Sequence, residues 1–145
     1  MDTISKAKRS EIMSRIRSTN TQPELVVRSM LHKLGYRFRL HRRELPGRPD
    51  IVLPRHRKVI LVHGCFWHGH TCKLASRPKS NQRYWADKIA RNQSRDAHAM
   101  DQLQVLGWEV LVLWECEIRA LRGVQERIVA FMNQDAHALS RPLDV

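Results

Sequence analysis

The sequence contains few cysteines, few acidic residues and no long apolar run. An odd number of cysteines, three in 145 residues, does not support a purely disulfide-bonded framework, and in a reducing cytosol thiols more often serve metals or catalysis. The longest strongly apolar run, 59–62, is far shorter than the roughly 20 residues of a membrane span, and the N-terminus lacks a secretory signal. We therefore expect a cytoplasmic protein without a membrane segment.

The length and composition predict one folded domain. With 145 residues, of which 42% are hydrophobic, the chain can build a core but hardly two, and its apolar content excludes disorder from lack of hydrophobic residues. No repeat, low-complexity tract or Gly/Ser linker marks a boundary. We expect a single domain over 1–145, in which the polar and basic residues 1–20 form a mobile arm with a short helix at 7–16.

The basic charge is concentrated in the first part of the chain. Lys and Arg number 26 against 14 Asp and Glu, and residues 1–58 hold 15 of the former and 5 of the latter. Arg outnumbers Lys by 19 to 7, which suits bidentate contacts with phosphates. The charge favours a polyanionic partner that meets the first third of the molecule, and the alternative is a solvated basic surface with no ligand.

Hydrophobic periodicity predicts an α/β fold. A capping box, Thr21 to Glu24, opens a helix over 22–34, and alternation predicts a strand over 36–40 with a basic outer face. Strands at 50–53 and 58–62 pair around a turn at 54–57, and then follow a helix over 81–106, a strand over 108–114 and a helix over 123–132. A strand, a long crossover helix and another strand imply parallel strands whose C-terminal ends share one edge.

The cysteines converge on that edge. Cys65 and Cys72 follow the strand 58–62 in a histidine-rich loop, and Cys116 follows the strand 108–114. Three thiolates and one imidazole make a closed tetrahedral site, which is typical of structural zinc. We favour His70 as the fourth ligand, although the spacing also allows His68 or His63. The alternatives are unrelated buried cysteines or a catalytic zinc, but four protein ligands leave no position for water.

An isolated carboxylate lies in the basic half of the chain. Asp50 begins a strand directly after Arg48 and Pro49, where it could recruit a hard cation such as Mg²⁺ for phosphodiester hydrolysis. Imidazole titrates near neutral pH, so His63 and His68 are candidate general bases. The structural alternative is an ordinary Pro-Asp turn before a strand, with histidines that serve packing or solubility.

Three motifs resemble the very-short-patch repair (Vsr) mismatch endonucleases. They are Leu-Pro-Gly-Arg-Pro-Asp-Ile-Val from Leu45, His-Gly-Cys-Phe-Trp-His over 63–68, and Trp-Glu-Cys over 114–116, and the similarity extends from about Ala7 to about Arg119. The resemblance implies a restriction-endonuclease-like core, with a mixed sheet flanked by helices and one structural zinc. It also implies an Mg²⁺-dependent enzyme that nicks one strand 5′ to the thymine of a T·G mismatch left by deamination of 5-methylcytosine.

The resemblance assigns a role to each motif residue. Asp50 and the main-chain carbonyl of Val62 would bind magnesium, His68 would deprotonate or orient the attacking water, and His63 and Glu24 would act through metal-bound water. The zinc ligands would be Cys65, His70, Cys72 and Cys116. The family pattern has Thr at the position of Val62 and His at the position of Gly69, which leaves the carbonyl ligand and both proposed sites in place.

The same resemblance predicts how DNA is bound. Phe66 and Trp67 would be presented as a wedge that enters the major groove at the disturbed base step, where unstacking costs least. One face of the long helix would meet the groove, with Lys88 and Asn92 reading the mismatched pair. That face consists of Trp85, Lys88, Asn92 and Arg95, which recur at helical spacing. The N-terminal arm would place Met13 in the minor groove.

Together, these expectations describe a bacterial enzyme that acts as a monomer on double-stranded DNA at the nucleoid. Repair proteins or a methyltransferase would be further partners. Two alternatives remain open from the residues alone. One is a zinc-stabilised DNA-binding module that does not cut, and the other is a related nuclease with a different DNA target. For the aromatic residues and the helix face, the structural alternatives are core packing and a solvated surface.

Overall fold

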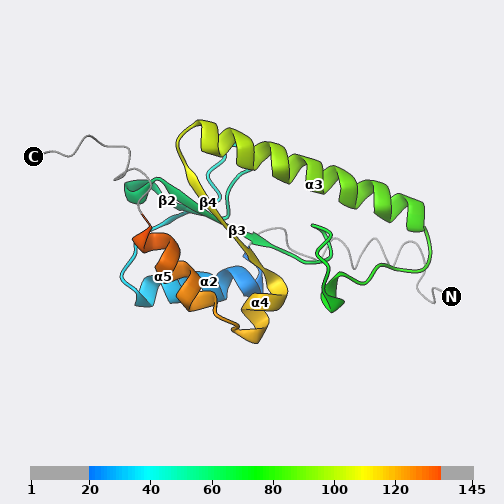
Figure 1. The fold of residues 1–145 in the computed structure, drawn as a ribbon, viewed down its shortest axis with the longest axis horizontal. Helices are drawn as coiled ribbons and strands as arrows, with labels where there is room; N and C mark the ends of the chain where they lie inside the picture. Colours follow the sequence, from blue (N-terminus) through cyan, green and yellow to red (C-terminus); the bar gives the residue numbers. More distant parts are fainter. Residues whose placement is uncertain (1–19, 135–145) are drawn as a thin grey trace, which may run out of the picture.

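The computed structural model describes residues 20–134, in which a four-stranded mixed sheet lies between helices on both faces (Figure 1). In order across the sheet, the strands are β1 (Arg39–Leu40), β2 (Ile51–Leu53), β3 (Lys58–His63) and β4 (Glu109–Trp114). β1 with β2 and β2 with β3 pair antiparallel, whereas β3 and β4 pair in parallel. The α/β class and the parallel pairing across the long helix are thereby confirmed.

The helices divide between the two faces of the sheet. α3 (Gln82–Val105) covers one face, and α2 (Gln22–Lys33), α4 (Glu115–Ala120) and α5 (Val124–Asn133) cover the other (Figure 1). α2, α3 and α5 lie within one or two residues of their predicted bounds. The sequence analysis missed α4, because this six-residue helix begins directly after β4 without a turn signal between them. Two single 3₁₀ turns, Pro54–His56 and Lys73–Ala75, complete the described elements.

β1 is shorter than its sequence pattern predicted. Only Arg39 and Leu40 pair, with Val52 and Ile51, because β2 itself has three residues and offers few partners. Tyr36 and Phe38, which were expected in the same strand, pack against the core from an irregular segment. The connection between β2 and β3 is the predicted turn, with Arg57 at a φ of 52°.

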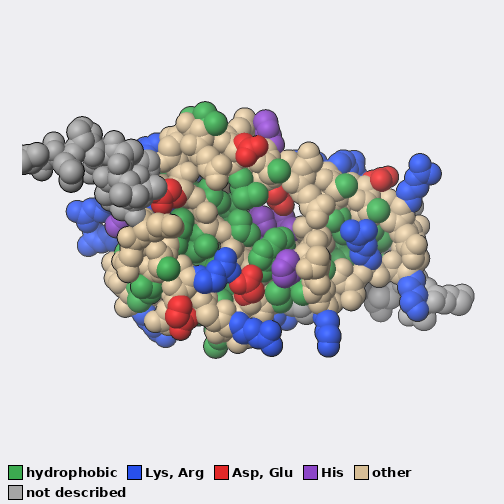
Figure 2. Space-filling view, viewed as in Figure 1, with side chains coloured by type: hydrophobic (Ala, Val, Ile, Leu, Met, Phe, Trp, Pro, Cys, Tyr) green, Lys and Arg blue, Asp and Glu red, His purple; other side chains and the backbone are tan. Residues whose placement is uncertain are grey.

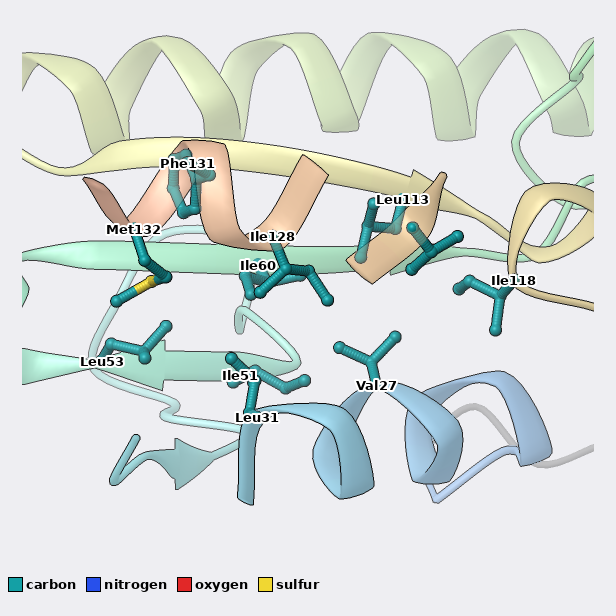
Figure 3. Close-up of a cluster of buried hydrophobic side chains, with 11 residues drawn as sticks. Val27, Leu31, Ile51, Leu53, Ile60, Leu113, Ile118, Ile128, Phe131 and Met132 are labelled. Carbon is teal, nitrogen blue, oxygen red and sulfur yellow. The ribbon is translucent and has the colours of Figure 1, made fainter. Parts of the chain in front are cut away.

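Alternation along the strands decides which helical layer each side chain supports. Ile51, Leu53 and Ile60 face the layer of α2 and α5 (Figure 3). Val52 and Val59 form a second cluster on the side of α3, together with Leu103 of that helix. The larger core cluster consists of Val27, Leu31, Ile51, Leu53, Ile60, Leu113, Ile118, Val124, Ile128, Phe131 and Met132. Because both faces are covered, the short central strands are apolar on both sides.

The predicted apolar stripe of α3 is correct only in part. Ile89 and Leu103 are buried and Ala86 and Met100 are half-buried, but Ala97 is exposed, because at about 100° per residue it lies well away from the face that carries Leu103. None of the helices that the structure describes has the length and apolarity to cross a bilayer. The predicted arm over 1–20, its helix over 7–16 and Met13 lie outside the described residues, apart from Asn20.

Candidate active site

Two carboxylates and one histidine meet where β2 begins. Asp50 directly precedes β2, and the antiparallel pairing with β3 brings it to Val62, whose main-chain N–H donates to Asp50 Oδ2 at 2.7 Å. Glu24, in the first turn of α2, is 1% exposed, and His41 follows β1. One ligand atom from each of Glu24, His41 and Asp50 lies within 4.8 Å of the other two. The sheet register therefore gathers residues that are far apart in sequence.

The Glu24 carboxylate is held through one of its oxygens. Oε2 accepts from the main-chain N–H of Asn20 at 3.1 Å and from Nη2 of Arg28 at 2.9 Å, and it lies 3.1 Å from Nε2 of His41. Thr21 Oγ1 accepts from the N–H of Glu24, as a capping box requires. In a capping box, the Glu24 side chain would accept from the main-chain N–H of Thr21, but here it accepts from the N–H of Asn20. Half of the predicted capping box is therefore present, and the other half involves the preceding residue.

His41 is a member of this site that sequence reasoning missed. It carries no motif of its own, because it follows an arginine-rich stretch that predicts only a basic strand face. Its main-chain N–H donates to the carbonyl of Asp50 at 3.2 Å, which fixes the two residues side by side at the end of β1. Only the pairing of β1 with β2 could have identified it.

The two carboxylates raise the affinity of this site for a cation. The pKa of Asp50 is raised to about 7, chiefly by burial and also by the nearby Glu24 charge, while the hydrogen bond from the Val62 N–H acts in the opposite direction. Two carboxylates this close repel each other when both are ionised, and a bound dication offsets that repulsion. Oxygen donors from Asp50 and Glu24, beside the Val62 backbone, are the ligand type that Mg²⁺ prefers. The residues present therefore fit a hard divalent cation.

A second group of side chains lies at the end of β3. His63 is the last residue of this strand, His68 lies in the loop that follows, and their rings stack with centroids 3.9 Å apart and 2° between their planes. Asp96, from α3, places Oδ2 at 2.5 Å from Nδ1 of His68. Burial lowers the pKa of His63 to about 4, with the charge of His68 acting in the same direction, so His63 is neutral near pH 7.

This arrangement suits proton transfer better than chelation. Parallel stacked rings direct their nitrogen lone pairs side by side, so they do not converge on one metal ion. The carboxylate of Asp96 holds Nδ1 of His68 and leaves Nε2 to accept a proton. Nδ1 of His63 is buried and has no hydrogen-bond partner among the described residues, so it can accept from a ligand or water. Sequence reasoning missed Asp96, because its position on a polar helix face carries no signal.

The third group brings together the four residues predicted to bind zinc. One ligand atom each from Cys65, His70, Cys72 and Cys116 lies within 4.8 Å of the other three. Sγ of Cys116 lies 3.5 Å from Nδ1 of His70. Tetrahedral zinc with Zn–S near ~2.3 Å and Zn–N near ~2.0 Å separates such atoms by about 3.5 Å. Neither His63 nor His68 belongs to this cluster, so the geometry favours His70 among the alternatives that the spacing left open.

The electrostatics of the thiols also fit a cation. Burial raises the pKa of Cys65 to about 12 and raises that of Cys116 above its ordinary value. Thiolates are therefore costly here unless a positive charge accompanies them, and a bound dication would supply it while protons are released. The donor set of three sulfurs and one imidazole fits structural zinc.

One ring links the thiol cluster with the histidine pair. His70 stacks on Trp114 with centroids 4.2 Å apart and 16° between the planes, and His63 meets the same indole edge-on at 5.1 Å. Trp114 is the last residue of β4 and lies opposite His63 in the parallel register. Figure 2 shows histidine and acidic side chains together on the face below α3. The three groups thus occupy one continuous edge of the sheet.

The aromatic residues that were expected to contact DNA pack against one another. Phe66 and Trp67 are half-buried, with ring centroids 5.0 Å apart, and both contact Trp85 edge-on, at 5.3 and 6.0 Å. Trp85 is only 6% exposed, so the prediction that it lies on an exposed helix face is wrong. It is four residues before Ile89 and shares the buried side of α3, where it supports the two loop rings.

The other predicted helix residues remain near the surface. Lys88 is half-buried, with Nζ 5.7 Å from the centre of a Trp67 ring and 6.0 Å from that of Tyr84. Nδ2 of Asn92 donates to the main-chain carbonyl of Trp67 at 2.9 Å, and Arg95 is exposed. Lys88 and Asn92 therefore support the aromatic loop in this structure, which the sequence analysis did not foresee.

Comparisons with known proteins identify similar sequences. The family model described as DNA mismatch endonuclease Vsr matches residues 1–74. A type II nicking enzyme, V.XorIIP of Xanthomonas oryzae pv. oryzae, is 50% identical over 127 residues, which are 88% of this chain and 93% of the relative. The type II nicking enzyme V.NmeAIP of Neisseria meningitidis serogroup A is 40% identical over 88% of this chain and 91% of its own. The DNA mismatch endonuclease Vsr of Escherichia coli is 43% identical over 81% and 76%.

The thiol cluster predicts one tightly bound zinc ion per chain. Cys116→Ala should unfold or aggregate the protein, because structural zinc contributes on the order of 10 kcal/mol to the folding of small metal domains. Elemental analysis of reduced, unstripped protein measures the zinc, and circular dichroism measures the folding. Thr71→Val, at an exposed loop position between two of these residues, is the control. Zinc-free wild-type protein, or a normally folded Cys116→Ala variant, would contradict the assignment.

The raised pKa of Asp50 predicts a stability that falls with pH. Below about pH 7 the folded protein keeps a proton on Asp50 that the unfolded chain, with a pKa near 3.8, has released. The contribution of Asp50 to stability therefore decreases as the pH rises toward 7 and then levels, by about 1.4 kcal/mol at most for each unit by which its pKa is raised. The lowered pKa of His63 acts in the opposite direction below about pH 6.5, so the Asp50 contribution is isolated by comparison with a variant. In EDTA-free buffer without added dication, Asp50→Asn should remove this slope and have the higher Tm above about pH 7.

Added Mg²⁺ provides the control for that experiment. It should raise the Tm of the wild type above about pH 7 and leave Asp50→Asn unchanged, because a ligand stabilises only the state that binds it. Equal pH slopes in the two proteins, or an equal response to Mg²⁺, would contradict the cation assignment.

Proposed function

This chain belongs to the Vsr family of DNA mismatch endonucleases, and on that premise we propose that it uses Mg²⁺ to nick one DNA strand 5′ to the thymine of a T·G mismatch. Such a cut begins very-short-patch repair of deaminated 5-methylcytosine. The observation that carries the proposal is that the Glu24 and Asp50 carboxylates lie at the same sheet edge as the His63, His68 and Asp96 group. One group suits a cation, and the other suits proton transfer.

Asp50 and the main-chain carbonyl of Val62 would hold the magnesium ion, and Glu24 would assist through water. When bound, Mg²⁺ neutralises charge on the scissile phosphate and lowers the pKa of coordinated water. Glu24 is oriented by Arg28 and His41, which both contact its Oε2, and one ligand atom of Glu24 lies within 4.8 Å of those of His41 and Asp50. Because Asp50 is buried beside a second carboxylate, it binds the cation in its ionised form and releases a proton on binding.

The histidines move the proton. His68 accepts it from the attacking water at Nε2, while Asp96 holds the opposite ring nitrogen and stabilises the imidazolium that forms. His63 is neutral and receives a hydrogen bond from water at its unpartnered Nδ1. Its ring, stacked on that of His68, also prevents His68 from rotating away. Asp96 is thus added to the catalytic residues that the sequence suggested.

The aromatic loop recognises the mismatch. Phe66 and Trp67 leave their contacts with Trp85 and insert into the disturbed base step, which costs a few kcal/mol and least at a mispair. Lys88 and Asn92 read the mismatched pair, Arg95 contacts the backbone, and Met13 approaches from the N-terminal arm. Trp85 supports the rings from beneath. We place the protein as a single-domain monomer in the bacterial cytoplasm, with double-stranded DNA as its partner and repair proteins or a methyltransferase as further ones.

Removal of the cation-binding carboxylate should separate binding from cutting. Asp50→Ala should bind a T·G duplex with nearly wild-type affinity, yet nick it at least about 100-fold more slowly, a larger loss than outer-shell substitutions cause. End-labelled duplexes, varied in mispair and sequence context, report the cut strand and position at nucleotide resolution. Asp101→Ala, an exposed acid on α3, is the matched control and should behave as the wild type.

Two outcomes would favour the alternatives. If wild-type protein with Mg²⁺ binds T·G duplexes tightly and never nicks them, the protein is a zinc-stabilised binding module. If it cuts matched duplexes or single strands as well as T·G duplexes, it is a nuclease with another target. Equal nicking by Asp50→Ala and the wild type would remove the metal assignment itself.

A further inference from the structure

The loop that carries Trp67 and His68 is attached to a single turn of α3. Asn92 donates to the main-chain carbonyl of Trp67 at 2.9 Å. Nε2 of the next residue, Gln93, lies 3.3 Å from the carbonyl oxygen of His68 and 3.5 Å from that of Gly69. These bonds fix the backbone of the loop, whereas Asp96 fixes only the His68 ring. The helix thus fixes both the backbone of the loop and the side chain of His68.

Gly69 is what allows the helix to approach this closely. Its φ is +65°, and a Cβ there would lie 2.4 Å from Nε2 of Gln93 and 2.7 Å from Cγ2 of Ile89. Both distances are far below van der Waals contact, and Ile89 is buried and cannot move aside easily. A larger residue would therefore displace Gln93 from the loop carbonyls. Gly69 is also one of the two positions, with Val62, at which this chain departs from the family pattern, which has His at position 69.

We propose that Gln93 is a positioning residue for His68, and that it ties the water-activating ring to the helix that meets the DNA groove. The proposal rests on the proposed function, because it assigns His68 and α3 the roles given there. Lys88 and Asn92, expected to read the mismatch, lie within two turns of Gln93 on one continuous helix. A helix moves as a unit, so a shift of α3 on DNA contact carries the His68 loop with it.

The effect should appear in the chemical step rather than in binding. Gln93 is exposed and lies outside the core, and Nε2 of its side chain hydrogen-bonds to carbonyls of the loop. Loss of its hydrogen bonds lets His68 depart from the geometry in which it meets the water. Loss of one such bond changes a rate constant by about three- to tenfold. DNA affinity does not depend on these bonds.

Gln93→Met tests this, because methionine keeps the length of glutamine but has no donor. Ser94→Ala, at the adjacent exposed position, is the control. Affinity for a T·G duplex is measured in EDTA, and the nicking rate constant is measured in a single turnover at saturating protein after Mg²⁺ is added. We expect Gln93→Met to keep its Kd within about twofold and to lose about three- to tenfold in the rate constant. Gly69→Ala should show the same split.

Two results would overturn the proposal. An unchanged rate constant in Gln93→Met would show that the bonds do not position His68. A weakened Kd with a normal rate constant would show that Gln93 merely contacts DNA.

Amide hydrogen exchange of the loop 66–70 keeps this test separate from the proposed function. Gln93→Met should exchange faster than the wild type in that loop, with unchanged exchange in β3 and β4 and unchanged zinc content. If the wild type nicks no T·G duplex but this difference is present, the proposed function fails and the loop attachment stands. If exchange in the loop is the same in both proteins, the attachment fails, whatever the activity.

Discussion

The pairing of β3 is the constraint on which the rest of the structure depends. This strand is antiparallel to β2 on one side and parallel to β4 on the other. Its C-terminal end therefore lies beside the start of β2 and the end of β4. Asp50, His63 and Trp114 come from these three places and become neighbours without any local sequence signal linking them. A shift of one residue in either register would turn every second side chain to the opposite face.

Both predicted metal groups cost stability until a cation is present. The buried thiol of Cys65 and the buried carboxyl of Asp50 have raised pKa values, so each resists ionisation in the apo protein. At the thiol cluster, a bound dication would offset this cost and release the thiol protons as the protein folds. At Asp50, a pKa of about 7 means that a dication has to displace a proton over only part of the population at neutral pH, so cation binding depends on pH there.

Much of this site was predictable from the sequence, and the exceptions have a common cause. Cys65 and Cys72 lie in one short loop, and the crossover from β3 to β4 brings Cys116 to the same edge, so the grouping of the three thiols followed from spacing and strand direction. Spacing alone left His63, His68 and His70 open as the fourth member, and the fold brings His70 to the thiols. His41 and Asp96 did not follow, because each joins the site only through a neighbouring element and looks like an ordinary polar surface residue in the sequence. Trp85 was wrongly predicted to be exposed, because helical spacing shows which residues share one side of a helix but not whether another segment packs against that side.

In the proposed function, recognition and chemistry share one segment, the aromatic loop. Trp67 and His68 are adjacent, so insertion of the indole into DNA cannot leave the imidazole where it was unless something holds the backbone between them. The bonds from Asn92 and Gln93 to the loop carbonyls act at this place. Trp114 supports the other side, because its indole contacts both His63 and His70 of the thiol cluster. The thiol cluster is therefore coupled to the histidine pair through one shared ring, whereas α3 holds the His68 side chain and its loop through Asp96 and Gln93.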